Sequence, residues 1–261
     1  MFNRPLHQQP YSIPRGVKIK HAQLPFENIY HTPGQNAGIR FFDPQSEVDL
    51  EAMRDILRGG QVKKWMDDTR QISKSEYRDW AGTESDTSFL FAALDARSRD
   101  PETMSHVRGF IYIYSEREEK FRVKRMEKQG FIEATNRPRY ALEVSFAVRP
   151  LRDGMQSGSG LMSSGLRQSC LQVQMLLNSP DRPEIILFAF TDTQNTNAQR
   201  TLEASGFVKK GLMKYDWDSE DLTYLYILNW RLLQKKIREK LLAGLPKTEA
   251  VDNVMVASSN L

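Results

Sequence analysis

The sequence has a single cysteine, Cys170, in 261 residues. One thiol cannot form an internal disulfide, and a cysteine-based zinc cluster needs several thiolates around one ion. Histidine is also scarce: His7, His21 and His31 lie near the N-terminus without the spacing of metal ligands, and His106 stands alone before an apolar segment. We therefore expect neither a disulfide framework nor a metal site.

Long apolar runs and a strong charge of one sign are absent as well. No stretch approaches the roughly 18 apolar residues that span a bilayer, and Met1 to Pro5 do not begin a signal peptide. The 37 basic and 33 acidic residues leave a net charge of +4, which suits an anionic ligand as well as nucleic acid. These features predict a soluble, cytoplasmic protein without a membrane partner.

The length and the 39% hydrophobic content predict one large domain with appendages. Residues 1–37 contain five prolines and no sustained period, which predicts an extended arm. We expect an α/β domain over 38–235, a basic helix over 229–243 and a loose tail over 244–261.

Hydrophobic periodicity predicts seven strands and at least four helices in the chain. Ser46 is expected to cap the first helix, and Gly206 to end a later one. The charged residues 116–139 fit a hairpin or a helix, and residues 62–80 fit one or two helices. The expected strands are 39–42, 88–94, 107–114, 140–148, 184–190, 208–215 and 222–230, and the clearest helices are 46–57, 159–178, 195–205 and 229–242.

A buried strand, a glycine-bearing turn and a helix start follow one another between residues 141 and 162. Glycines let backbone N–H groups approach a ligand closely, and a helix N-terminus adds partial positive charge, so the turn suits a pyrophosphate. A Walker A loop is excluded because Leu166 and Arg167 follow Gly165. A dinucleotide fingerprint is disfavoured because Ser163 stands at the position of its last glycine.

The sequence resembles the GNAT superfamily of acetyl-CoA-dependent N-acetyltransferases. Residues 148–150 (Val-Arg-Pro) match the end of that family's fourth strand, and 158–160 (Gly-Ser-Gly) match its pyrophosphate loop. Residues 195–198 (Asn-Thr-Asn-Ala) and 206–207 (Gly-Phe) match its second motif at the right spacing. The resemblance runs from Ile39 to Trp230.

The resemblance implies an α/β (α+β) fold with a mixed, mostly antiparallel central sheet and helices on both faces. It implies that acetyl-CoA lies in a splay between the fourth and fifth strands. The loop is two residues longer than usual, so the position that holds Arg or Gln in the family falls on Met155. The implied cofactor-binding residues are Phe146, Ala147, Val148, Met155, Gln156, Ser157, Gly158, Ser159, Gly160, Asn195 and Asn197. Asn195 and Asn197 serve equally well as helix caps.

Glu143 is the candidate general base because it is the only ionisable residue from Ala141 to Val148. A carboxylate there can take a proton from an ammonium substrate, directly or through water. The alternative for Glu143 is an ion pair with a nearby arginine. A main-chain N–H near Ala147 or Val148 would stabilise the oxyanion, as in similar enzymes.

The tyrosine that serves as general acid in many family members is replaced by Leu202. Tyr215, Tyr224 and Tyr226 lie on the last two strands, and Tyr215 is taken as the catalytic candidate. Cys170 lies on an apolar helix face, which predicts a core residue rather than an acylated nucleophile.

The expected reaction is transfer of an acetyl group from acetyl-CoA to a primary amine of a small molecule or polypeptide, by direct attack on the thioester. A second hypothesis is RNA- or tRNA-directed acyl transfer, because residues 116–139 hold eight basic and five acidic residues and 231–242 hold five and one. A third is a noncatalytic acyl-CoA-binding module. Homodimerisation, frequent among similar enzymes, is left open.

Overall fold

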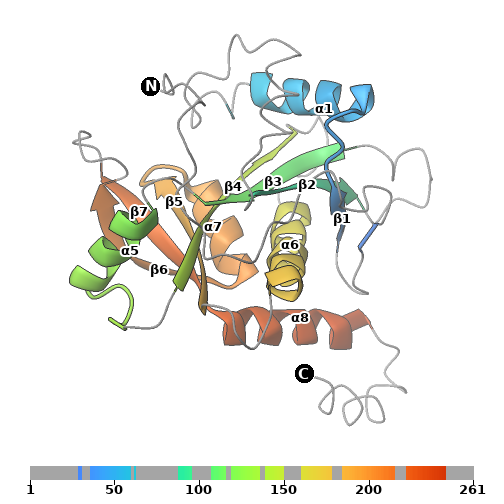
Figure 1. Cartoon of the computed structure of the whole chain (residues 1–261). Helices are drawn as coiled ribbons and strands as arrows, with labels where there is room; N and C mark the ends of the chain where they lie inside the picture. Colours follow the sequence, from blue (N-terminus) through green and yellow to red (C-terminus); the bar gives the residue numbers. More distant parts are fainter. Residues whose placement is uncertain are drawn as a thin grey trace.

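Figure 1 shows the computed structural model, which describes residues 29–30, 36–59, 62, 88–95, 107–115, 119–135, 139–149, 160–177, 184–214 and 222–244. The strands of these segments form one sheet, in the order β1-β2-β3-β4-β5-β7-β6. Their bounds are β1 Ala37–Phe41, β2 Ser88–Asp95, β3 Val107–Tyr114, β4 Arg139–Val148, β5 Glu184–Asp192, β6 Phe207–Lys214 and β7 Leu222–Leu228.

Only β4 and β5 pair in parallel; the other neighbouring strands of the sheet are antiparallel. A parallel pair needs a crossover connection, and α6 (Leu161–Leu177) supplies it. The mixed, mostly antiparallel sheet is the one predicted from the sequence.

Helices cover both faces of the sheet, as predicted. On one face, the largest apolar cluster joins α6 to strand residues and includes Leu202 and Leu233, from α7 (Thr196–Ser205) and α8 (Trp230–Gly244). On the other face, α1 (Glu47–Arg58) packs over the first four strands, and α5 (Glu119–Lys128) packs toward β5, β6 and β7. Figure 1 shows α1 (light blue) and α8 (red) on opposite sides of the sheet.

The predicted caps are confirmed. Ser46 accepts a hydrogen bond from the backbone N–H of Asp49 at 3.3 Å and starts α1. Gly206 ends α7 with φ +100°, a left-handed conformation in which a glycine avoids the strain of a side chain. Residues 62–80, Val62 excepted, and the tail from residue 245 lie outside the described residues, as does most of the arm. Tyr30 of the predicted arm bridges to Ile39 of β1.

Within the ambiguous segment 116–139, the described residues 119–135 contain a helix, α5, and no hairpin. Met126 is buried against the sheet, and Val123 packs beside it, one turn earlier. Gly130 follows the helix with φ +72°. Among the described residues, no helix is long and apolar enough to cross a membrane.

Candidate active site

Strands β4 and β5 part in the middle of the sheet. Their parallel register runs from Arg139 opposite Glu184 to Glu143 opposite Phe188. Beyond that point β4 continues to Val148 alongside β3, and β5 continues along β7. The described residues 144–148 and 189–192 therefore diverge, and the inner edge of β4 is left without a strand partner. A parting at this place is what the resemblance to the GNAT superfamily implies.

Glu143 is the last β4 residue paired with β5, so it lies where the strands part. Its side chain is buried, at 4% exposure, and Arg122 of α5 approaches it, with Nη1 at 3.1 Å from Oε2. The guanidinium of Arg122 also lies 5.3 Å from the ring centroid of Phe190. The ion pair considered as the alternative for Glu143 is thus present. A charged pair this deep in a sheet face is costly to desolvate, so one partner without the other would destabilise the fold.

Aromatic residues share the face of the sheet that carries Glu143. Tyr114 of β3 lies opposite Glu143, and Tyr112 lies opposite Ser145, so all four project from the same face. The rings of Tyr112 and Tyr114 stack with centroids 4.5 Å apart. Glu143 therefore lies between the apolar cluster under α1 and the one under α5. This part of the sheet face presents aromatic rings beside polar side chains.

The start of α6 lies just beyond the predicted pyrophosphate turn. Gly160 has φ +67°, and its carbonyl accepts hydrogen bonds from the Ser163 hydroxyl at 3.0 Å and from the Ser164 N–H at 2.9 Å. The first-turn N–H groups of such a helix have no intrahelical partner and favour an anion. The predicted residues of the turn itself lie outside the described residues: Met155, Gln156, Ser157, Gly158 and Ser159.

The three β4 residues that the resemblance implies as cofactor contacts differ in solvent exposure. Phe146 is half-buried, Ala147 is buried and Val148 is exposed, at the end of the strand that leads to the turn. The backbone N–H of Arg149 still bonds to the carbonyl of Arg108, at 2.7 Å. The outer end of β4 is therefore fixed to β3 while its other edge is open.

The second motif forms the start of α7. The side chain of Asn195 accepts a hydrogen bond from the N–H of Ala198 at 3.1 Å, so Asn195 caps the helix. Asn197 is exposed, and its carbonyl accepts a bond from the Thr201 hydroxyl. Leu202 is fully buried in the core. The leucine at the position of the family's tyrosine thus has a packing role.

The tyrosines of the last strands have other partners. The hydroxyl of Tyr226 donates to Glu203 Oε1 at 3.2 Å, and burial together with Glu203 raises its pKa. Tyr224 receives Lys209 over its ring, with Nζ 3.1 Å from the centroid. Tyr215 lies outside the described residues.

Cys170 is fully buried among apolar residues of α6, and desolvation raises the pKa of its thiol. A neutral thiol in the core is a poor nucleophile, which agrees with the packing role expected from the sequence.

Sequence reasoning missed Arg122, Tyr112 and Tyr114. Arg122 lies in the segment of ambiguous period, where the three-residue step from Val123 to Met126 was the only sign of a helix face. The two tyrosines were seen only as part of a strand. Their shared face with Glu143 follows from the strand register, which a single sequence does not contain.

No protein-family model matches the sequence. No curated protein matches it.

Solved structures do match the fold at low sequence identity. RimJ of Mycobacterium smegmatis in complex with CoA-disulfide is 14% identical, with a TM-score of 0.53 over 83% of this chain and 92% of its own. The acetyltransferase AAC(6')-Ib in complex with paromomycin and acetyl-CoA is 14% identical, with a TM-score of 0.51 over 77% of this chain and 97% of its own. An uncharacterized protein of Bacillus halodurans is 11% identical, with a TM-score of 0.53 over 80% of this chain and 92% of its own. With its parallel β4–β5 pair in an otherwise antiparallel sheet, the chain has the fold of the GNAT acetyltransferases.

Proposed function

We propose that the protein is an N-acyltransferase that moves an acetyl group from acetyl-CoA to a primary amine. The observation that carries the proposal is the parting of β4 and β5 at a buried carboxylate. An open strand edge offers backbone groups to a ligand, and a carboxylate at the same place offers a proton acceptor. Among solved structures with this fold, RimJ is in complex with CoA-disulfide, and AAC(6')-Ib is in complex with acetyl-CoA and paromomycin or with coenzyme A and kanamycin, which supports the same reading.

The donor would be held by backbone groups. The open edge of β4 at Phe146, Ala147 and Val148 is suited to an amide-bearing chain such as pantetheine. The turn that ends at Gly160 and the first turn of α6 are suited to the pyrophosphate. Bound there, acetyl-CoA supplies a thioester whose carbonyl carbon accepts the attacking nitrogen.

Glu143 is the proposed base. In the proposed step the amine nitrogen loses a proton to the carboxylate, a C–N bond forms and the C–S bond breaks. Arg122 holds the carboxylate at 3.1 Å and so fixes the side chain that receives the proton. A backbone N–H near Ala147 or Val148, on the same strand, would stabilise the oxyanion. Tyr215 is kept as the candidate that returns a proton to the thiolate.

The acceptor would approach on the face of Glu143. Tyr112 and Tyr114 offer aromatic surface there, and aromatic faces attract ammonium groups. This surface suits an amine carried on a small molecule or at the end of a polypeptide.

Thiol release from acetyl-CoA tests the proposal. Wild-type protein is supplied with a panel of polyamines, aminoglycosides, lysine peptides and peptides with free N-termini, and at least one class is expected to release thiol. Glu143→Gln should lower kcat/KM for that amine by about 10²- to 10⁴-fold, because general base catalysis contributes this much. Acetyl-CoA affinity should change little, and thermal unfolding of Glu143→Gln checks that the variant stays folded under assay conditions without the charged pair to Arg122.

The matched control is Glu184→Gln. Glu184 is a half-exposed carboxylate on the neighbouring strand that also pairs with an arginine, Arg139, at 2.7 Å. It lies at the far end of the β4–β5 register, so its variant should keep kcat/KM within about twofold of wild type. Acetyl-CoA binding without turnover of any amine would instead indicate the noncatalytic module.

A further inference from the structure

A hollow of about 410 Å³ lies between α6, the end of α7 and α8. Its volume is in the range of small-molecule pockets. The hollow is on the face of the sheet that α6, α7 and α8 cover, opposite the face that carries Glu143. It is therefore distinct from the proposed site of amine attack.

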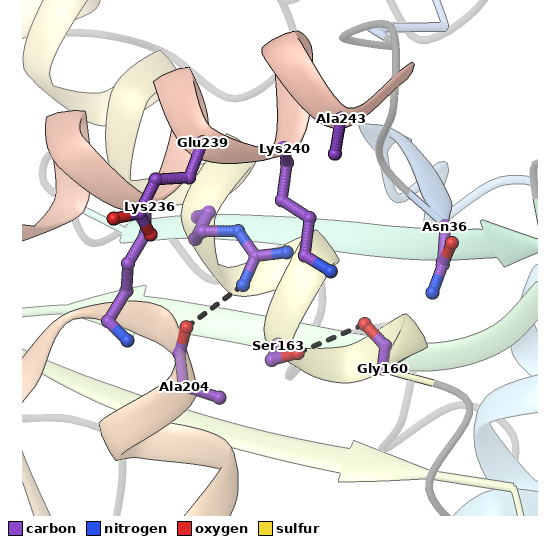
Figure 2. Close-up of a pocket in the computed structure, with 9 residues that line it drawn as sticks. Asn36, Gly160, Ser163, Ala204, Lys236, Glu239, Lys240 and Ala243 are labelled. Carbon is purple, nitrogen blue, oxygen red and sulfur yellow. Dashed lines mark hydrogen bonds between the residues drawn. The ribbon is translucent and has the colours of Figure 1, made fainter.

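Among the described residues that line the hollow, the charged groups are mostly cationic. Arg167 of α6 and Lys236 and Lys240 of α8 line it, against one carboxylate, that of Glu239. Glu239 is itself 3.9 Å from Lys235, one turn earlier on α8. Figure 2 shows Lys240 reaching from α8 toward the first turn of α6, where Gly160 and Ser163 lie.

Arg167 lines the hollow as a buried residue, whereas Lys240 is exposed. Its side chain is 5% exposed, and Nη1 donates to the carbonyl of Ala204 at 2.9 Å, which fixes the guanidinium between α6 and α7. Burial lowers the pKa of Arg167 because desolvation disfavours its charged form. An anion in the hollow would offset that desolvation.

We propose that this hollow binds a phosphate monoester. Three cations from two helices outweigh one carboxylate, which fits a group of about two negative charges better than a single carboxylate. Lysine is a common phosphate ligand, and a buried arginine adds a fixed fork of donors. The first turn of α6, which follows Gly160, adds the partial positive charge of a helix N-terminus.

Two sources can supply this group. Gly160 borders both the hollow and the turn proposed for pyrophosphate, so the 3′-phosphate of the acyl donor is one source, and this assignment rests on the proposed function. A separate phosphorylated metabolite is the other source, and it does not depend on the activity.

Titration calorimetry at low salt tests the site with three probes: acetyl-CoA, acetyl-3′-dephospho-CoA and inorganic phosphate. The variant is Lys240→Ala. The control is Arg238→Ala, which removes one charge from the same helix at an exposed position outside the hollow. Both positions are exposed, so both variants are expected to fold.

If the hollow holds the donor's phosphate, Lys240→Ala weakens acetyl-CoA binding about tenfold and leaves the dephosphorylated donor unchanged. If it holds a separate phosphate, Lys240→Ala weakens only the binding of inorganic phosphate, about tenfold. Equal affinities for wild type and Lys240→Ala with every probe would overturn the site. Failure of acetyl-CoA to bind at all would count against the proposed function, while inorganic phosphate still decides the hollow.

Discussion

The carboxylate of Glu143 and the guanidinium of Arg122 join α5 to the centre of the sheet. Both groups are largely buried, and Phe190 packs against the guanidinium. Pairing offsets the desolvation of each charge, so the same contact that positions a proposed base also holds a helix. The pairing with Arg122 explains how the charge of Glu143 is tolerated in the buried middle of β4.

Cys170 provides a test of direct transfer. Because the side chain is fully buried and its pKa is raised by desolvation, we expect no reaction with a thiol reagent at pH 8 in the native protein. In denaturant one thiol per chain should react rapidly. Cys170→Ala should also keep kcat within about twofold, with a stability loss of about 1 kcal/mol. A fast native reaction, or loss of turnover in Cys170→Ala, would indicate an acylated cysteine instead.

Two glycines with positive φ follow helices next to the candidate site, Gly206 after α7 and Gly130 after α5. Gly206 ends α7 and lies against the start of α8, where a Cβ at Gly206 would be 3.0 Å from the backbone N and Cα of Leu233. Gly130, after α5, also has a positive φ but has open space around its Cβ position. Alanine substitutions at Gly206 and Gly130 therefore distinguish the cost of backbone strain, present at both, from the cost of a steric clash, present only at Gly206.

Gly206→Ala should therefore destabilise the protein more than Gly130→Ala. Left-handed backbone alone costs about 1–2 kcal/mol for alanine, which is the loss expected at Gly130. The additional clash with Leu233 should raise the loss at Gly206 to about 3 kcal/mol or more. Urea unfolding measures both values, and equal losses would show that α8 moves aside without cost.

Substitutions at Asn195 distinguish its role as the N-cap of α7 from a contact with the acetyl donor. Asn195→Ala should cost about 1 kcal/mol of stability because the N–H of Ala198 loses its acceptor. Asn195→Ser keeps a capping oxygen and should restore stability. If donor affinity in Asn195→Ser also equals that of wild type, the residue acts only as a cap. A loss of affinity in both variants would indicate contact with the cofactor.

Local patterns predicted most of these elements because their causes are local. The cap at Ser46, the stop at Gly206 and the apolar face of α6 are all properties of neighbouring residues. The sequence allows an ion pair between Glu143 and an arginine but does not identify Arg122 as the partner, since the two residues are 21 positions apart and meet only when α5 docks on the sheet. The cationic hollow was missed for the same reason, because Arg167 and Lys240 come from separate helices.

The molecule as a whole uses the two faces of one sheet differently. The parting of β4 and β5 lies in the sheet between the two layers of helices. On one side, Glu143 and the stacked tyrosines form the proposed acceptor face. On the other, α6, α7 and α8 line the proposed phosphate site. A donor held between the strands would thus reach both.

Thermal unfolding with and without acetyl-CoA tests this account most directly, with ATP and NADH as controls. A ligand that binds only the folded state stabilises it by about 2.7 kcal/mol at a hundredfold excess over its Kd. For a protein of this size that corresponds to a rise in Tm of about 5–10 °C. We predict such a rise with acetyl-CoA and none with the controls. No shift with acetyl-CoA, or an equal shift with NADH, would contradict the assignment as an acetyltransferase.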